Sequence, residues 1–209
     1  MNQTVNELQM PLALEAVRGL KIGDLVSLSG IFFSCRSKFQ KKITRNEIDS
    51  PDALKGINVM CHMGPVMKKQ GAEWLTISAG PTTSFRMDAY GPAMIKRLKL
   101  RAIIGKGTMG KKTMEAMREQ GCVHLSSIGM DANCLPRTIK RVVSVSYLEE
   151  FGMIEAVWVF EAKQWGPFLV DIDATGANYF HKIDVQARKR LPQIMARLGV
   201  DPDYRYAAS

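Results

Sequence analysis

Residues that could carry chemistry are concentrated in two turns near the middle of the chain. Residues 80–88 read GPTTSFRMD and residues 104–107 read IGKG, and each turn follows an apolar, strand-like run and precedes a helix-like run. Arg86 offers a planar fork of N–H donors that suits a carboxylate, while Lys106 offers a compact positive charge. Two cations beside several hydroxyls predict a site for a substrate with two acidic groups.

Thr82 and Thr83 stand just before the periodic segment 87–100, which predicts a helix. A threonine in this place faces the free N–H groups and the positive end of the helix dipole, where a carboxylate or phosphate binds. Taken singly, either threonine is also explained as an ordinary helix cap, Arg86 as a surface charge and Lys106 as a solvated loop lysine. Their occurrence together favours an anion site.

A second hypothesis comes from residues 105–110, which match the dinucleotide pattern G-x-G-x-x-G between an expected strand at 101–104 and an expected helix at 111–119. The acidic residue expected about twenty positions later is unconvincing, because Asp131 lies in a polar turn after Gly129. No second half-fold of similar size follows. Nucleotide binding through this loop is therefore the alternative, behind carboxylate binding.

Length and composition narrow the class of protein. The 209 residues suit one domain with a sizeable core, and the net charge of +9 fits anionic substrates, an acidic partner or nucleic acid. Aromatic residues do not alternate with the basic clusters and no nucleic-acid motif occurs, so we expect no nucleic-acid partner. The cysteines and histidines lack ligand spacing, which predicts buried free thiols and no metal site in this chain.

The sequence also suggests where the chain works. Residues 1–9 are polar and lack the basic start and apolar core of a signal peptide. No apolar run approaches the ~18 to 20 residues that cross a bilayer. We therefore expect a soluble cytoplasmic protein with no membrane partner.

Alternating and continuous apolar runs predict a mixed α/β chain built around a sheet. Strands are expected at 25–33, 57–61, 73–78, 101–104, 122–127 and 142–147, with a hairpin turn at 69–72 and a further pair of strands at 156–162 and 168–173 around a turn at 164–167. Residues 1–9 are expected to be a mobile tail, 37–49 a helix or loop, and 131–141 a helix or irregular segment. An amphipathic helix is expected at 179–198, disturbed at Pro192.

Four sequence motifs carry a resemblance to a known family. They are residues 80–88, residues 104–107, the HMGP turn at 62–65 and the segment 149–159. From about Leu20 to Phe180 the chain resembles the β subunit of class I iron-sulfur fumarases and L-tartrate dehydratases. The resemblance implies an α/β fold: a single swivelling β/β/α domain with a mixed sheet and flanking helices at 20–180, after a lead-in at 1–19 and before a C-terminal helix and tail at 181–209.

The same resemblance implies an activity and a partner. It implies a hydro-lyase of the tricarboxylic acid cycle that reversibly hydrates fumarate to L-malate, with L-tartrate or mesaconate as alternative substrates. A [4Fe-4S] cluster, held by a partner α subunit, is the implied cofactor, and its open iron acts as a Lewis acid. An α2β2-type hetero-oligomer is implied, in which this chain grips the dicarboxylate and is active only with its partner.

Five residues match functional positions of that family. The resemblance implies that Arg36, Arg86 and Lys106 bind the substrate, with Thr83 beside them, and that Thr82 is the catalytic base. A threonine hydroxyl must be activated by its surroundings to act as a base, and the sequence offers Arg86 or the helix N-terminus as the activating neighbour.

The chain departs from the family at three positions near these residues. Ser37 and Gln40 stand where an acidic residue and a histidine are usual, and Phe85 stands where many fumarases have a small residue. Tartrate dehydratases can carry a bulky residue at the place of Phe85. These differences bear on the identity of the substrate, for which fumarate and malate are the first expectation.

Overall fold

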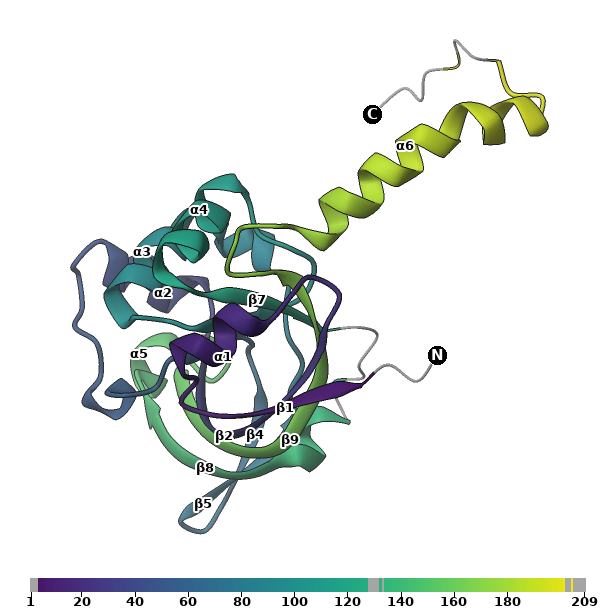
Figure 1. Cartoon of the computed structure of the whole chain (residues 1–209). Coiled ribbons are helices and arrows are strands. Elements are labelled where there is room, and N and C mark those ends of the chain that lie inside the picture. The colour runs from purple at the N-terminus through teal and green to yellow at the C-terminus, as the bar shows by residue number, and fades with distance from the viewer. Residues whose placement is uncertain (1–3, 128–131, 133, 202–203, 205–209) are drawn as a thin grey trace.

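The computed structural model describes residues 4–127, 132, 134–201 and 204, and its centre is a sheet that closes into a barrel (Figure 1). The strands of this sheet are β1 (Val5–Gln9), β2 (Leu25–Cys35), β3 (Val59–His62), β6 (Ala102–Gly105), β7 (Val123–Ser127), β8 (Ile139–Ser146) and β9 (Val157–Ile172). Their order is β1-β2-β3-β6-β7-β9-β8, and an additional β2–β9 pairing closes the ring. The expected mixed α/β class is confirmed.

The pair of strands expected at 156–162 and 168–173 is a single long strand, β9, so that prediction was wrong. The predicted turn bends the strand, with Gln164 at φ 52° and Gly166 at φ 141°, but does not reverse it. Trp165 is fully buried and stacks on Phe32 of β2, with ring centroids 3.9 Å apart. Burial of this large ring keeps the bent segment within the sheet.

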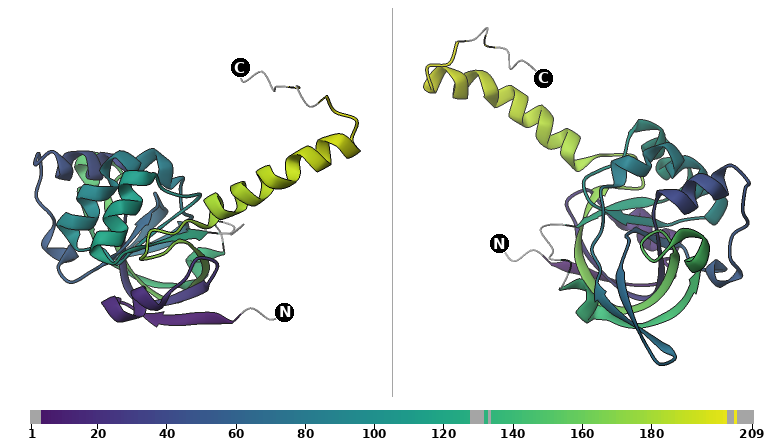
Figure 2. Two further views of the ribbon diagram at one scale, coloured as in Figure 1. Left: turned by 45° about the horizontal axis from the view of Figure 1, so that its top comes forward. Right: turned by 180° about the vertical axis from the view of Figure 1, so that it is seen from behind.

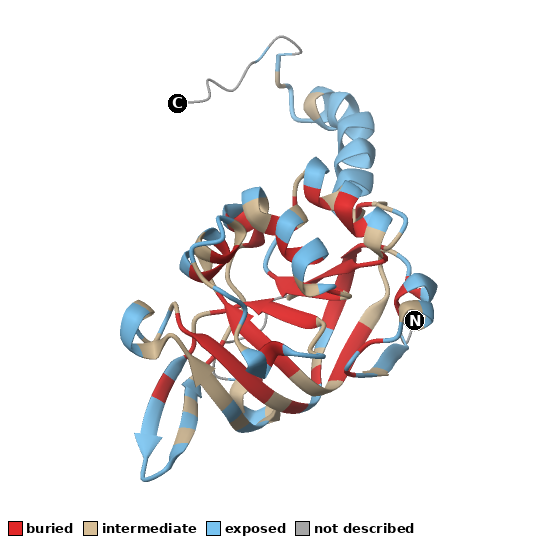
Figure 3. Ribbon diagram, turned by 90° about the vertical axis from the view of Figure 1, so that its left-hand side faces the viewer, coloured by how far each residue is buried: buried red, intermediate tan, exposed pale blue. Residues whose placement is uncertain are grey.

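Side chains of the closed sheet alternate between two apolar cores, because successive residues of a strand point to opposite faces. Leu28 and Phe32 of β2 pack inside the barrel with Ile104 of β6, whereas Phe33 and Ile103 pack on the outer face. Both cores are buried (Figure 3). The continuous apolar runs of these strands therefore serve two faces at once.

Three of the helices, α2 (Ser37–Thr44), α3 (Gly91–Leu98) and α4 (Lys111–Gln120), cover the outer face of the parallel part of the sheet (Figure 1). The other helices are α1 (Leu14–Gly19), α5 (Leu148–Phe151) and α6 (Tyr179–Arg197), with 3₁₀ turns η1 (Asp52–Leu54), η2 (Ser84–Tyr90) and η3 (Leu135–Thr138). Phe39 of α2, Ile95 of α3 and Met117 of α4 enter the outer core. Each of these helices contributes an apolar face and leaves a polar face to solvent.

Two further segments refine the sequence predictions. The expected hairpin turn is confirmed, because β4 (Val66–Gln70) and β5 (Glu73–Ser78) form a separate two-stranded sheet. The tail expected at 1–9 contains β1, which pairs in parallel with β2, so Val5–Gln9 is ordered by backbone hydrogen bonds. The helix or irregular segment predicted at 131–141 lies partly outside the described residues, and its described part contains η3 and the start of β8.

The C-terminal helix α6 projects away from the barrel (Figure 2). None of its residues is buried, and it continues through Pro192. Asn178 caps its first turn by accepting a hydrogen bond from the His181 N–H at 3.1 Å. Across the described residues, no helix has the length and apolarity that a bilayer span requires.

Removing most of α6 should leave the barrel intact, since the helix contributes no buried side chain. A chain that ends after Ile183 is expected to unfold within about 3 °C of the full chain, the scale set by surface changes well below 1 kcal/mol. Differential scanning calorimetry measures this. As a contrast, Leu28→Ala should cost about 2–5 kcal/mol. A large loss on truncation would show that α6 packs on another surface in solution.

Candidate functional site

The predicted site residues emerge at one edge of the barrel. Strands β2, β3, β6 and β7 are parallel neighbours, so their carboxyl ends meet at the same edge. Cys35 of β2 is level with His62 of β3, and Arg36 follows directly. Lys106 follows Gly105, the last residue of β6. Parallel pairing thus brings together two cations that are 70 positions apart in the sequence.

Thr82 and Thr83 lie between the ends of β3 and β6. The Thr82 N–H donates to the His62 carbonyl at 2.7 Å, and the Lys106 N–H donates to the Thr82 carbonyl at 3.0 Å. Thr83 forms a parallel bridge with Lys106. These backbone bonds place Thr82, Thr83 and Lys106 side by side at the edge of the barrel.

Arg86 reaches back to Thr82. Its Nη2 donates a hydrogen bond to the Thr82 hydroxyl oxygen at 2.8 Å. The Thr82 proton is therefore not used in this bond, and the guanidinium charge lies against the oxygen. A cation that donates to an oxygen stabilises the oxygen's anionic form.

The expected helix start at the threonines differs in the structure. The segment after Thr83 is the 3₁₀ turn η2, the α-helix begins only at Gly91, and the Thr83 side chain caps nothing. The anion site at a helix start therefore stays a prediction, since Thr83 precedes a 3₁₀ turn and not an α-helix. Arg86 is a positive charge that lies directly against Thr82.

Arg36 has an acidic neighbour that sequence reasoning missed. Its Nε lies 3.5 Å from Glu155 Oε1, and the second Glu155 oxygen accepts a hydrogen bond from the Lys38 N–H at the start of α2. Gly64 leaves room for Arg36, because a Cβ on Gly64 would lie 2.7 Å from Arg36 Cδ. Glu155 thus contacts the Nε edge of the guanidinium and fixes its direction.

The site face is open to solvent. Arg86 and Lys106 are exposed, Thr82 is half-buried, and Phe85 is 65% exposed beside them. Gln40 is fully buried within α2, so this departure from the family does not lie on the open face. Phe85 is exposed and Ser37, directly after Arg36, is half-buried, so these two departures have surface that a ligand can reach.

The three glycines at 105–110 have structural explanations. Gly105 has a hydroxyl packed against its Cα, and Gly107 has a φ of 80° that side chains rarely adopt. Gly110 lies against Asp88, whose Oδ1 accepts from the Gly110 N–H and the Thr113 hydroxyl, both at 2.7 Å. The start of α4 already binds a carboxylate, so the place where a phosphate would bind is taken.

A buried chain of polar side chains lies beneath the site, and sequence reasoning did not find it. His62 Nδ1 lies 3.0 Å from Ser84 Oγ, Ser84 Oγ lies 2.9 Å from His124 Nε2, and His124 Nδ1 lies 2.6 Å from Asp171 Oδ1. Burial, together with the smaller effect of the nearby His124, lowers the pKa of His62 to about 3. The only sequence signal was polar residues inside otherwise apolar strands.

The cysteines of this chain do not form a cluster site. Cys35, Cys61 and Cys122 are buried free thiols as predicted, whereas Cys134 is exposed, so the prediction was wrong for this residue. Burial raises the pKa of all three buried thiols. Among the described residues, no three His, Cys, Asp or Glu side chains are grouped to hold a metal ion, so they do not fit a [4Fe-4S] cluster.

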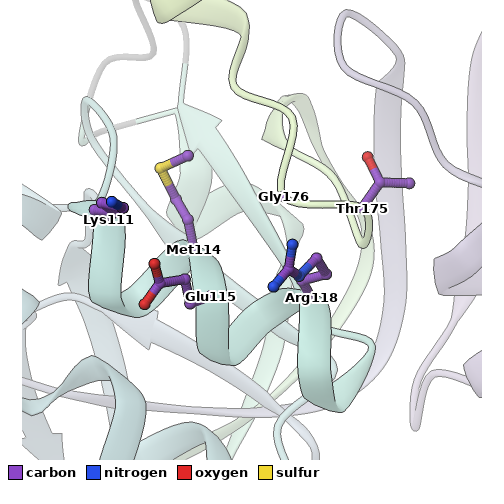
Figure 4. Close-up of a pocket in the computed structure, with 6 residues that line it drawn as sticks. All are labelled: Lys111, Met114, Glu115, Arg118, Thr175 and Gly176. Carbon is purple, nitrogen blue, oxygen red and sulfur yellow. The ribbon is translucent and has the colours of Figure 1, made fainter.

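A surface pocket lies elsewhere, between α4 and the turn after β9 (Figure 4). It is lined by Lys111, Met114, Glu115, Arg118, Thr175 and Gly176. None of the five predicted site residues lines this pocket. The predicted site residues lie at the edge of the barrel and not in this hollow.

Comparison with known proteins defines the family. The family described as Fumarase C-terminus matches residues 2–183, and the chain belongs to it. A protein of Escherichia coli (strain K12) named L(+)-tartrate dehydratase subunit beta is 30% identical over 173 residues, covering 82% of this chain and 84% of that protein. A Methanocaldococcus jannaschii protein provisionally given that name is 33% identical over 186 residues, covering 88% and 95% of the two chains.

A relative with a different name shows how this chain corresponds to a longer protein. A Geobacillus stearothermophilus protein provisionally named fumarate hydratase class I is 36% identical over 187 residues, which make up 89% of this chain but 35% of that protein. The similarity places the chain with the β subunits of fumarate hydratase and tartrate dehydratase-type hydro-lyases. It does not separate the two substrates.

The buried, neutral His62 should make stability depend on pH. Its pKa is about 3 in the folded chain against an ordinary 6.5, so the unfolded chain binds more protons as pH falls below 6.5. The free energy of unfolding should be highest above this pH and fall by up to about 1.4 kcal/mol per pH unit below it. Urea titrations between pH 5 and 7 measure the slope.

The exposed His181 supplies the matched control for this prediction. His62→Asn should flatten the dependence between pH 5 and 6.5, whereas His181→Asn should leave it unchanged. Equal slopes in the wild type and His62→Asn would contradict the burial of a neutral His62.

Proposed function

We propose that this chain is the β subunit of a [4Fe-4S]-dependent hydro-lyase that reversibly hydrates fumarate to L-malate. The observation that carries the proposal is the convergence of Arg36, Thr82, Arg86 and Lys106 on one edge of the barrel. Cations held on separate strand ends suit the two carboxylates of one small substrate. Membership in the Fumarase C-terminus family supports the same class of reaction.

Each site residue has a proposed part in the reaction. Arg36, Arg86 and Lys106 bind the carboxylates, with Thr83 beside them, and Thr82 exchanges a proton with the substrate carbon next to a carboxylate. Removal of that proton builds negative charge on the carboxylate, which the nearby cations stabilise. Arg86 has a second part, because its hydrogen bond to the Thr82 oxygen favours the deprotonated hydroxyl.

A partner α subunit completes the site in this proposal. The described residues of this chain offer no group of side chains that could bind a cluster, so we assign the [4Fe-4S] group to the partner, where a metal would assist loss of the hydroxyl group. The open, positively charged edge is the face that the partner covers. We propose that the chain swivels against this subunit within an α2β2-type assembly, and that the enzyme works in the cytoplasm.

L-tartrate is the second candidate substrate. Phe85 places an exposed aromatic ring beside Thr82 and Arg86, where many fumarases have a small residue. The name of the Escherichia coli relative points the same way. Mesaconate, a methylated relative of fumarate, stays a further alternative, whereas the carboxylate at the start of α4 argues against the nucleotide hypothesis.

Removing either exposed cation should abolish efficient turnover. Arg86→Ala and Lys106→Ala are each expected to lower kcat/KM by about 10²-fold or more, because each removes a preorganised partner of the developing charge. The assay is anaerobic, uses the chain together with its native partner subunit, and follows malate, tartrate and mesaconate in parallel before and after exposure to air.

Two controls belong with this experiment. Lys163→Ala removes an exposed lysine of β9 outside the site and should keep the wild-type rate, and gel filtration should show that all variants still bind the partner. Wild-type rates in both Arg86→Ala and Lys106→Ala would mean that the site lies elsewhere. Loss of turnover after exposure to air supports an iron-sulfur partner.

A further inference from the structure

Four residues at the edge of the barrel form a closed ring of hydrogen bonds. Thr82 N–H donates to the His62 carbonyl, Lys106 N–H donates to the Thr82 carbonyl, and Ser84 N–H donates to the Lys106 carbonyl, at 2.7, 3.0 and 3.0 Å. The 3.0 Å contact between Ser84 Oγ and His62 Nδ1 closes the ring. Two proposed site residues, Thr82 and Lys106, are thus linked to two buried polar residues.

The ring is anchored to the far side of the barrel through Ser84. The same Ser84 oxygen contacts His124 Nε2 of β7, and His124 Nδ1 contacts Asp171 Oδ1 of β9. The side chains of His62, Ser84, His124 and Asp171 are all fully buried. Four separate segments are therefore joined by side-chain contacts below the site.

The contacts among Ser84, His124 and Asp171 have the order of a serine nucleophile triad. Ser84 cannot act as such a nucleophile, because it has no exposed surface that a substrate could reach. Its oxygen also lies between two imidazole rings and already contacts both. A nucleophile must reach a substrate, so these residues act on their neighbours instead.

The hydrogen bonds fit one direction of donation when both imidazoles are neutral. The Asp171 carboxylate accepts from His124 Nδ1–H, which leaves His124 Nε2 as an acceptor for the Ser84 hydroxyl. Ser84 then accepts from His62 Nδ1–H. In all three hydrogen bonds the donor is on the His62 side and the acceptor is on the Asp171 side. Each of the two imidazoles then has a single defined tautomer.

The buried chain requires a glycine at position 105. A Cβ at Gly105 would lie 1.7 Å from Ser84 Oγ and 3.3 Å from His124 Nε2. The first glycine of the IGKG turn therefore makes room for the serine hydroxyl. The residue before Lys106 and the buried chain are parts of one packing arrangement.

We propose that His62, Ser84, His124 and Asp171 form a positioning chain, which holds the backbones of Thr82 and Lys106 in place through donation in one direction toward Asp171. The chain touches no substrate, and its residues are positioning residues. Its effect on turnover rests on the proposed function, whereas its effect on the two backbones does not.

The first test is nitrogen NMR of the full chain labelled with ¹⁵N-histidine, which contains only three histidines. The ring proton of His62 and that of His124 should both lie on Nδ1, with none on Nε2. His181, which is exposed, gives the reference signal. A proton on Nε2 of either buried histidine, or a charged ring, overturns the direction of donation.

The second test removes the shared hydroxyl with Ser84→Ala. Hydrogen exchange at the Thr82 and Lys106 amides should become about tenfold faster, the scale of one lost hydrogen bond, while exchange in β2 stays unchanged. Ser34→Ala is the matched control. Ser34 of β2 is fully buried, as Ser84 is, but its hydroxyl has no hydrogen-bond partner. Unchanged exchange at Thr82 and Lys106 overturns the proposal.

Turnover gives the third readout. In the complex with the partner subunit, Ser84→Ala should lower kcat/KM by about tenfold on whichever dicarboxylate the wild type uses, and Ser34→Ala should not. A wild-type enzyme that dehydrates none of the acids refutes the proposed function. The NMR and hydrogen-exchange results then still test whether the positioning chain exists. If the Ser84→Ala variant is too unstable to study, the histidine tautomers measured by NMR in the wild type test the proposal.

Discussion

Closure of the sheet by β9 is the constraint on which the rest of the molecule depends. This strand pairs with β2 and β7, so a sheet that would otherwise have open edges becomes a barrel with an apolar interior. Trp165 holds the bend that makes this closure possible, because its ring is buried against Phe32. The same closure brings Asp171 of β9 beside His124 of β7.

At the edge of the barrel, the cationic side chains are exposed, whereas the neighbouring polar side chains are buried. The cations Arg86 and Lys106 are exposed, where water lowers the cost of their charges, while His62 is buried and its pKa is lowered so that it stays neutral. Backbone hydrogen bonds connect these two layers through Thr82. The charged face therefore rests on a buried polar layer that contains the neutral His62.

The glycine pattern at 105–110 shows how one motif can have two physical causes. In a dinucleotide site such glycines admit a phosphate, whereas here Gly105 admits Ser84 and Gly110 admits Asp88. The carboxylate of Asp88 occupies the start of α4 in place of a ligand. The strand, the turn and the helix occur in the expected order, but the glycines of the turn have structural explanations that do not require a nucleotide.

The sequence by itself determined the mixed α/β class, most strands of the barrel and the two turns that carry Thr82, Arg86 and Lys106, because periodicity and turn residues are local properties. The family was also readable from these motifs. Only the tertiary structure decided that β9 is one strand, that Glu155 faces Arg36, and that four polar residues from distant segments meet below the site. These features depend on strand pairing and burial between residues far apart in the chain, which no local pattern records.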